Sequence, residues 1–177
     1  MKALVVYESM FGNTEQIAHA VANGLSDRMT VETQEVSQAR SETADLLDLI
    51  VIGGPTHAFS MTRQQTREDA VRQGAHPAST TRGIREWLEY LRPDPHSELV
   101  ATFDTRVDKV RHLPGSAAKK AAKVSHKLGY PAAAKPESFY VHDVSGPLLE
   151  GELDRARAWG RQLGAEAARR PRPAVAE

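Results

Sequence analysis

An apolar segment that runs directly into a glycine-containing turn, and from there into a helix, constrains this chain more than any other feature. The segment is Val5–Tyr7, and the helical pattern begins at Thr14. A helix N-terminus presents unpaired backbone N–H groups and a partial positive charge, so an anion is favoured there. Gly12 allows the backbone to approach a bound group closely. Because Ser9, Asn13 and Thr14 add side-chain donors, we predict that this turn binds a terminal phosphate.

The turn lacks the features of two common phosphate-binding loops. No Lys follows Gly12 within the turn, although loops that bind nucleoside triphosphates need one to neutralise charge. Gly12 also stands alone, whereas the dinucleotide fingerprint needs three glycines at fixed spacing. A turn rich in hydroxyl groups and poor in cations suits a single phosphate monoester held mainly by hydrogen bonds.

Apolar runs alternate with helical patterns along the rest of the chain, which indicates an α/β fold with a doubly wound, five-stranded parallel sheet. Right-handed crossovers and the polar character of the second strand favour the strand order 2-1-3-4-5. In that order, the loops after the first and third strands meet one ligand. The expected strands are Lys2–Tyr7, Met29–Val36, Asp48–Gly53, Leu99–Phe103 and Ser138–Val144, and the expected helices are Thr14–Arg28, Glu42–Leu47, Gly83–Arg92, Ser116–Leu128 and Gly151–Arg169.

The helical patterns also predict which side chains face the sheet. In the first helix these are Ile17, Val21 and Leu25, and in the last they are Leu153, Ala156, Gly160 and Leu163. Trp87 and Trp159 lie on predicted helices and are interpreted as core residues.

The chain length fits one domain, which we place at residues 1–169. Residues 170–177 contain two prolines and are predicted to be a disordered tail. The connection Thr56–Arg82 is long enough to be a functional lid, with a helical piece around Gln65–Gln73.

The stretch from Val5 to Val21 resembles the FMN-phosphate loop of the flavodoxin family, with two apolar residues, an aromatic, a hydroxyl residue, a small residue and Thr in order. The resemblance implies the flavodoxin fold, FMN as cofactor and a phosphate loop made of Ser9, Met10, Phe11, Gly12, Asn13 and Thr14. Phe11 is a departure, because many flavodoxins have a third hydroxyl residue there. Because Phe11 replaces that hydroxyl residue, we expect one hydrogen bond to the phosphate to be missing.

The segment after the third strand resembles the corresponding loop of flavodoxin-like quinone reductases through its Gly-Pro-Thr core. The resemblance implies cofactor contacts from Pro55, Thr56, His57, Ala58 and Phe59. His57 and Phe59 can cover one face of the flavin ring. Two alternatives stay open, in which His57 is a solvated loop residue and Phe59 plugs the lid.

After the fourth expected strand, the resemblance implies that Thr102, Phe103, Asp104, Thr105 and Arg106 face the flavin. Phe103 has a second interpretation as the last core residue of its strand. No Tyr or Trp follows Arg106 before Tyr130. We therefore expect that the flavin ring is not sandwiched between two aromatic side chains.

Composition excludes several other classes of protein. The chain has no Cys, so disulfides and thiolate metal sites are impossible. Its 23 basic and 23 acidic residues balance, which argues against nucleic acid as the main partner. No segment is long and apolar enough to span a membrane, and the histidines show no metal-binding spacing. We expect a cytoplasmic protein without a metal.

These observations leave three hypotheses for function. The first is an FMN-binding electron carrier that passes electrons between a reductase and an acceptor protein. The second is an FMN-dependent NAD(P)H:quinone-type oxidoreductase whose pocket is shaped by the Thr56–Arg82 lid. The third is a scaffold without cofactor, against which the intact Ser9–Thr14 loop argues. With His57 and Arg106 on the flavin loops, we expect the reduced flavin to be less disfavoured than in acidic flavodoxins.

Overall fold

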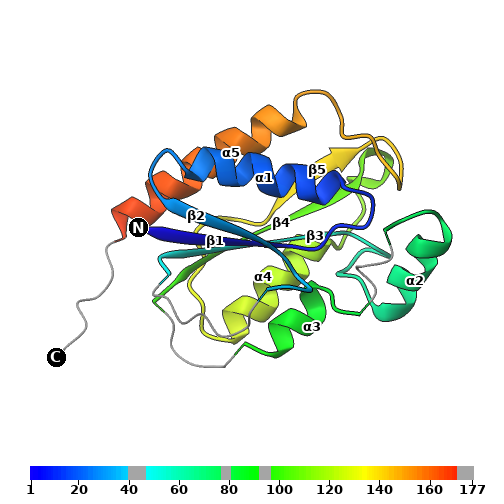
Figure 1. Cartoon of the computed structure of the whole chain (residues 1–177), viewed down its shortest axis with the longest axis horizontal. Helices are drawn as coiled ribbons and strands as arrows, with labels where there is room; N and C mark the ends of the chain where they lie inside the picture. The colour runs from blue at the N-terminus through cyan, green and yellow to red at the C-terminus, as the bar shows by residue number, and fades with distance from the viewer. Residues whose placement is uncertain (40–46, 77–80, 92–96, 171–177) are drawn as a thin grey trace.

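A parallel sheet of five strands forms the middle layer of the molecule, with helices on both faces (Figure 1). The computed structural model describes residues 1–39, 47–76, 81–91 and 97–170. The strands are β1 (Lys2–Tyr7), β2 (Thr30–Glu35), β3 (Leu49–Pro55), β4 (Leu99–Val107) and β5 (Glu137–Val141). The helices are α1 (Asn13–Leu25), α2 (Gln64–Arg72), α3 (Ile84–Glu89), α4 (Ala117–Lys127) and α5 (Glu152–Arg169), with a short 3₁₀ turn, η2 (Asp108–Val110).

The order of the strands is β2-β1-β3-β4-β5, which confirms the predicted topology. Each neighbouring pair is parallel, so all five strands end at the same edge of the sheet. In Figure 1 helix α2 lies at this edge, whereas the other helices cover the faces. The loops that follow β1, β3 and β4 therefore meet at one end of the molecule.

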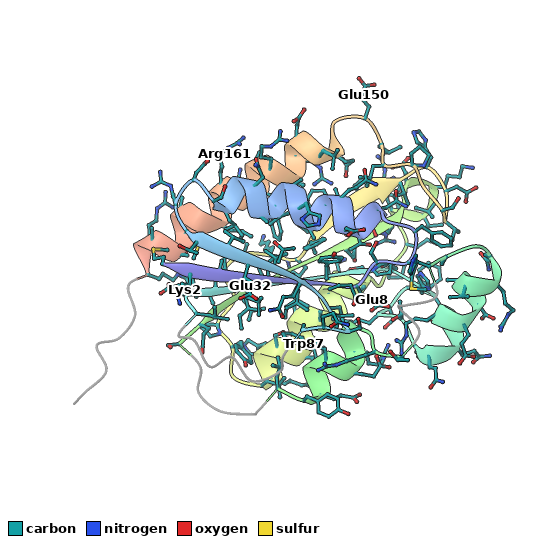
Figure 2. All side chains as sticks on the ribbon, viewed as in Figure 1. Lys2, Glu8, Glu32, Trp87, Glu150 and Arg161 are labelled. Atoms are coloured by element: carbon teal, nitrogen blue, oxygen red, sulfur yellow. The ribbon has the colours of Figure 1, made fainter. Side chains whose placement is uncertain are left out.

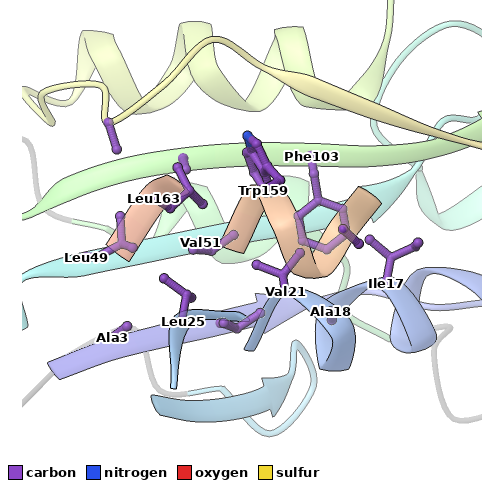
Figure 3. Packing of buried hydrophobic residues seen from close by; sticks show 14 of the residues in the cluster. Ala3, Ile17, Ala18, Val21, Leu25, Leu49, Val51, Phe103, Trp159 and Leu163 are labelled. Carbon is purple, nitrogen blue, oxygen red and sulfur yellow. The ribbon is translucent and has the colours of Figure 1, made fainter. Parts of the chain in front are cut away.

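Helices α1 and α5 cover one face of the sheet (Figure 3). Ile17, Val21 and Leu25 of α1 are fully buried, as predicted. Trp159 and Leu163 of α5 join the same core cluster. Burial of each large side chain contributes about 1.5–3 kcal/mol, so this stripe fixes the helix that begins at the phosphate loop.

Helices α3 and α4 cover the opposite face, with Ile84, Trp87 and Leu88 of α3 in the second core. Trp87 is buried beneath the sheet (Figure 2). The interpretation of both tryptophans as core residues is confirmed. Ser116 caps α4 by accepting a hydrogen bond from the backbone N–H of Lys119.

Helices α1 and α5 cross in close backbone contact at two glycines. A Cβ on Gly24 would lie 2.0 Å from the carbonyl oxygen of Arg157, and one on Gly160 would lie 2.2 Å from that of Val21. No side chain fits at either position. The crossing therefore sets the position of α1 against the sheet.

Three expectations from the sequence are wrong in detail. Strand β4 continues to Val107 instead of ending at Phe103, so the residues expected in a loop belong to the sheet. Strand β5 ends at Val141 instead of Val144. Leu153 was expected to face inward, but it is 39% exposed because it lies on the outer side of the first turn of α5. The helix predicted at Glu42–Leu47 and the tail at 170–177 fall almost wholly outside the described residues.

Candidate functional site

The turn between β1 and α1 has the geometry that favours an anion. Gly12 has a positive φ of 83° at the N-cap of α1, which only glycine adopts easily. The Ser9 hydroxyl oxygen accepts hydrogen bonds from the backbone N–H groups of Gly12 and Glu15. Among the described residues, no acceptor bonds to the N–H groups of Phe11, Asn13 and Thr14. These unpaired donors and the helix dipole favour a negative group at this point.

Thr14 links the turn to strand β4. Its hydroxyl oxygen lies 2.7 Å from that of Thr105, and both side chains are buried. One proton is used within this pair, so the second hydroxyl proton is available to a ligand. The pair fixes the phosphate loop against the end of the sheet.

The β5–α5 connection closes another side of the turn. The side-chain amide of Asn13 donates to the carbonyl oxygen of Ser145 at 3.1 Å. A Cβ on Gly146 would lie 2.6 Å from the Asn13 side-chain oxygen. The close fit of Gly146 leaves Asn13 one orientation.

A small cleft of about 50 Å³ opens beside the turn. This volume holds a group of a few atoms, and the cleft is open on its outer side. The lining comes from the loops and strand ends after β1, β3, β4 and β5. Its residues are Met10, Phe11, Asn13, Thr14, Pro55, Thr56, His57, Thr105, Arg106, Val107, Val141 and Val144.

Arg106 brings a positive charge to the cleft. Its side chain is 5% exposed. The guanidinium group donates to the carbonyl oxygens of Val110, Leu113 and Gly115, with the shortest distance 2.7 Å to Val110. The arginine thereby holds the 108–115 loop, which follows β4.

Asp104 and Thr56 connect β3, β4 and α4 below the cleft. One carboxylate oxygen of Asp104 accepts hydrogen bonds from the Thr56 hydroxyl and the Ala118 N–H, each at 3.0 Å. The Thr56 hydroxyl also accepts a hydrogen bond from the N–H of Ala117. The N-terminus of α4 is thus filled by side chains of this chain and is not a second anion site.

A tight turn after β3 places Phe59 beside the cleft. Two hydrogen bonds of 3.0 Å join the backbones of His57 and Ser60. The central residues Ala58 and Phe59 have positive φ values of 46° and 61°, as in the mirror-image turns of hairpins. Phe59 is 48% exposed, and its backbone packs on Gly115, where a Cβ would meet the Phe59 oxygen at 2.6 Å.

Arg85 of α3 holds the turn from below. It donates to the carbonyl oxygens of Met61 and Thr62 and to the hydroxyl oxygen of Ser60. Burial lowers the pKa of His57, against the effect of a hydrogen bond to the backbone of Thr66. A neutral imidazole is therefore favoured at the mouth of the cleft.

A buried polar cluster fastens the 56–76 segment to the strand that precedes the phosphate loop. The Glu8 carboxylate is 1% exposed and accepts hydrogen bonds from the Thr62 hydroxyl (2.5 Å) and the Ile84 N–H (2.9 Å). Arg67 donates to the Thr62 hydroxyl oxygen at 3.0 Å and to Glu86 at 3.1 Å. Figure 2 shows Glu8 on the side of the sheet that faces α3.

Burial raises the pKa of Glu8 to about 7, although the hydrogen bonds from Thr62 and Ile84 and the charge of Arg67 lower it. The Glu8 carboxyl group therefore titrates near neutral pH although it is buried.

Helix α2 also contacts the phosphate loop, because Ala70 and Ala75 pack against Met10. The N–H of His76 donates to the Met10 carbonyl oxygen.

The structure brings together most of the residues that the sequence singled out. Nine of them line the cleft: Met10, Phe11, Asn13, Thr14, Pro55, Thr56, His57, Thr105 and Arg106. Ser9 and Gly12 shape the turn, and Ala58 and Phe59 form the tip of the turn after β3.

Thr102, Phe103 and Asp104 lie below the cleft and do not line it. Phe103 is in the first core, under Gly53, and Thr102 donates to the carbonyl oxygen of Ala118. Their expected loop position is corrected by the longer β4, whereas the second interpretation of Phe103 as a core residue is confirmed. These residues are buried because β4 lies between β3 and β5 in the sheet.

Sequence reasoning missed the contribution of β5 and its following loop. Val141 and Val144 line the cleft, and the Ser145 carbonyl oxygen fixes Asn13. Since parallel strands end at one edge, the end of a fifth strand was a usable signal. Among the described residues, no group of three His, Asp or Glu side chains can hold a metal ion. In the same described ranges, no helix is long and apolar enough to cross a membrane.

Comparison with solved structures identifies the fold. The chain is similar to oxidised flavodoxin 2 from Bacillus cereus, with 19% identity, a TM-score of 0.67 and coverage of 94% of this chain and 99% of that one. A flavodoxin from the domain Archaea matches with 17% identity and a TM-score of 0.63 over 95% and 99% of the two chains. A WrbA-like flavodoxin from Agrobacterium tumefaciens matches with 15% identity and a TM-score of 0.58 over 96% and 99%.

No protein-family model and no curated protein sequence matches the chain. The fold is therefore flavodoxin-like. The chain has the flavodoxin fold over nearly its whole length.

Proposed function

We propose that this protein binds FMN and transfers electrons between a reductase and an acceptor protein. The observation that supports the proposal most is the turn after β1, which offers unpaired N–H groups at Phe11, Asn13 and Thr14 beside the Ser9 hydroxyl group. The cleft fits a group of a few atoms, such as a terminal phosphate. The solved flavodoxins with the same fold support the choice of a flavin.

The residues present fit the phosphate end of FMN. Thr14 and Thr105 share one hydroxyl proton and leave the other for an acceptor. Arg106 lines the same cleft but faces the 110–115 loop, so its charge is not counted among the donors to the phosphate. The rest of the cofactor would extend to the open side, past the Thr56–Phe59 turn. When bound, FMN supplies the redox chemistry, and the chain orients it and sets its electrostatic environment.

Binding of FMN, compared with binding of riboflavin, tests this proposal. We expect wild-type protein to quench FMN fluorescence and to bind riboflavin much more weakly, because riboflavin lacks the phosphate. Ser9→Ala combined with Thr14→Val should weaken FMN binding by about 2–6 kcal/mol, at about 1–3 kcal/mol for each bond to a charged group. Riboflavin binding should change little.

A matched control removes the same groups from exposed positions. Ser26→Ala with Thr30→Val changes a hydroxyl that bonds only within its own turn and one at the start of the edge strand. FMN affinity should stay unchanged in this control. Equal affinity of wild-type protein for FMN and riboflavin would contradict a phosphate site, and a chain that binds neither would favour a scaffold function.

A second candidate function is direct NAD(P)H:quinone oxidoreduction. The specific observation in its favour is the segment at the cleft mouth, where Phe59 is half exposed on a rigid turn and α2 contacts the phosphate loop. The discriminating experiment adds NADH or NADPH and a quinone to FMN-loaded protein without a reductase. Rapid oxidation of the nicotinamide would favour the enzyme, and its absence would favour the carrier.

A further inference from the structure

Arg106 is a buried cation near the end of β4. Among the described residues, no Asp or Glu side chain forms an ion pair with its guanidinium group. The nearby Arg111 is different, because it is exposed and pairs with Asp108 at 3.2 Å. Burial of a charge without a counter-charge is strongly unfavourable, so the position of Arg106 needs an explanation.

Backbone carbonyl groups explain only part of the burial of Arg106. The two terminal nitrogens of Arg106 donate to three carbonyl oxygens of the following loop. The remaining nitrogen, Nε, is buried and has no partner among the described residues. Carbonyl dipoles satisfy N–H groups, but they do not neutralise a full charge.

Asp104 does not supply the missing charge. It lies two residues earlier on β4, and one of its carboxylate oxygens is engaged by Thr56 and by the Ala118 N–H. The other oxygen is buried without a partner, and no contact with Arg106 forms. Arg106 also lines the cleft, where a bound anionic group would supply the counter-charge.

Arg106 and Thr105 point to opposite sides of β4. Side chains alternate along a strand, so Thr105 faces Thr14 on the α1 side, whereas Arg106 faces the 110–115 loop. Gly115 of that loop packs against Phe59, the residue expected to cover the flavin ring. The hydroxyl and N–H donors of the turn therefore lie on one side of β4, and the cation lies on the side of Phe59.

We propose that Arg106 provides positive charge to the flavin-ring end of the site and strengthens binding of the reduced, anionic form of FMN over the oxidised form. The inference rests on the proposed function, since it assumes that FMN binds in this cleft. A cation near a ring that gains negative charge stabilises the reduced state. This effect is the opposite of that expected from an acidic environment.

The test measures dissociation constants for oxidised FMN and for dithionite-reduced FMN under anaerobic conditions. Arg106→Gln should weaken binding of reduced FMN at least about tenfold more than binding of oxidised FMN, because one buried charge is lost. Arg106→Lys keeps the charge and should keep the wild-type ratio of the two constants. Arg111→Gln removes an exposed charge from the same loop and serves as the control, with no change in the ratio.

A second variant leaves the hydrogen bonds of Arg106 in place, in case Arg106→Gln does not fold. Val107→Glu adds a carboxylate to the cleft lining, and Val107→Gln is its neutral control. Val107→Glu should weaken binding of reduced FMN more than binding of oxidised FMN, whereas Val107→Gln should leave the ratio of the two constants unchanged.

The outcomes separate this inference from the proposed function. If wild-type protein binds FMN and neither Arg106→Gln nor Val107→Glu changes the ratio of the constants, the role of Arg106 is overturned while FMN binding stands. If Arg106→Gln weakens binding of oxidised and reduced FMN equally, the role of Arg106 is also overturned, because the residue would then act on the phosphate or on the loop. If wild-type protein binds neither form, both proposals fail together.

Discussion

The hydroxyl groups of Thr14 and Thr105 lie 2.7 Å apart although 91 positions separate them along the chain. Thr14 lies in the first turn of α1, and Thr105 lies near the end of β4. Their contact joins the turn before α1 to the strand that also presents Arg106. One buried hydrogen bond therefore connects these two parts of the candidate flavin site.

Removing this pair should reveal non-additive effects on FMN binding. We expect Thr14→Val and Thr105→Val each to weaken FMN by about 1–3 kcal/mol, or roughly 5- to 150-fold. The double variant should lose less than the sum, because either change already breaks the pair. Fluorescence titration of the four proteins measures the coupling. Strict additivity would show that the two hydroxyl groups act independently.

The stability of the fold should depend on the ionisation of Glu8. Its pKa is about 7 in the folded chain, against an ordinary value of 4.5. The folded chain binds the proton more tightly, so the stabilisation is complete below about pH 4.5 and is lost as the pH rises through about 7. Relative to Glu8→Gln, wild-type protein should lose about 3 kcal/mol of unfolding free energy from about pH 4.5 to about pH 8.

Urea unfolding of both proteins across this range measures the difference. Glu68→Gln changes a carboxylate on the exposed side of α2 and is the control. A wild-type unfolding free energy that rises with pH, relative to Glu8→Gln, would mean that Glu8 is stabilised as a carboxylate instead.

Two glycines of α5 should respond to alanine in opposite ways. A Cβ on Gly160 would lie 2.2 Å from the backbone oxygen of Val21, whereas one on Gly164 would meet only side-chain atoms at 3.7–3.8 Å. Gly160→Ala should therefore cost about 2–3 kcal/mol or more, since the helices must move apart. Gly164→Ala should gain up to about 1 kcal/mol from helix propensity. Thermal unfolding of both variants tests the crossing, and equal melting temperatures would contradict it.

The turn at Ala58 should become more stable with glycine. Ala58 has a φ of 46°, and a left-handed conformation costs a non-glycine residue about 1–2 kcal/mol. Ala58→Gly should raise the unfolding free energy by up to about 1 kcal/mol, after allowance for the greater freedom of glycine in the unfolded chain. Ala168→Gly, at an exposed position of α5, should lower it. If both changes destabilise the protein, Ala58 is not strained.

The sheet order and the turn before α1 could be predicted because they depend on local pattern. The apolar residues of β1 and the spacing of Ile17, Val21 and Leu25 determine where the chain enters the sheet and leaves it. The turn between them needs only Gly12 and its donors. Each of these signals lies within a few residues of the structure that it specifies.

The end of β4 could not be predicted in the same way. Asp104, Thr105 and Arg106 are polar, and polarity at a strand end is typical of a loop. Asp104 and Thr105 are buried beside groups from other elements, the Ala118 N–H for Asp104 and the Thr14 hydroxyl for Thr105. Such pairings follow from the tertiary fold and leave no periodic signal.

The Glu8 cluster was equally hidden. Thr62 and Ile84 are far from Glu8 in sequence, and Glu8 occupies a turn where an exposed carboxylate would be ordinary. Leu153 shows the reverse problem, because it falls on the apolar stripe of α5 but is 39% exposed.

The Glu8 cluster gives the ligand-binding edge a common dynamic behaviour. Thr62, Arg67 and Ile84 are joined to the residue that directly precedes the phosphate loop, and Met10 of that loop contacts α2. Neither segment opens to solvent without breaking the buried bonds of the other. Amide hydrogens of α2 and of the second turn of α1 should therefore exchange with solvent at a shared rate, as parts of one cooperative opening unit.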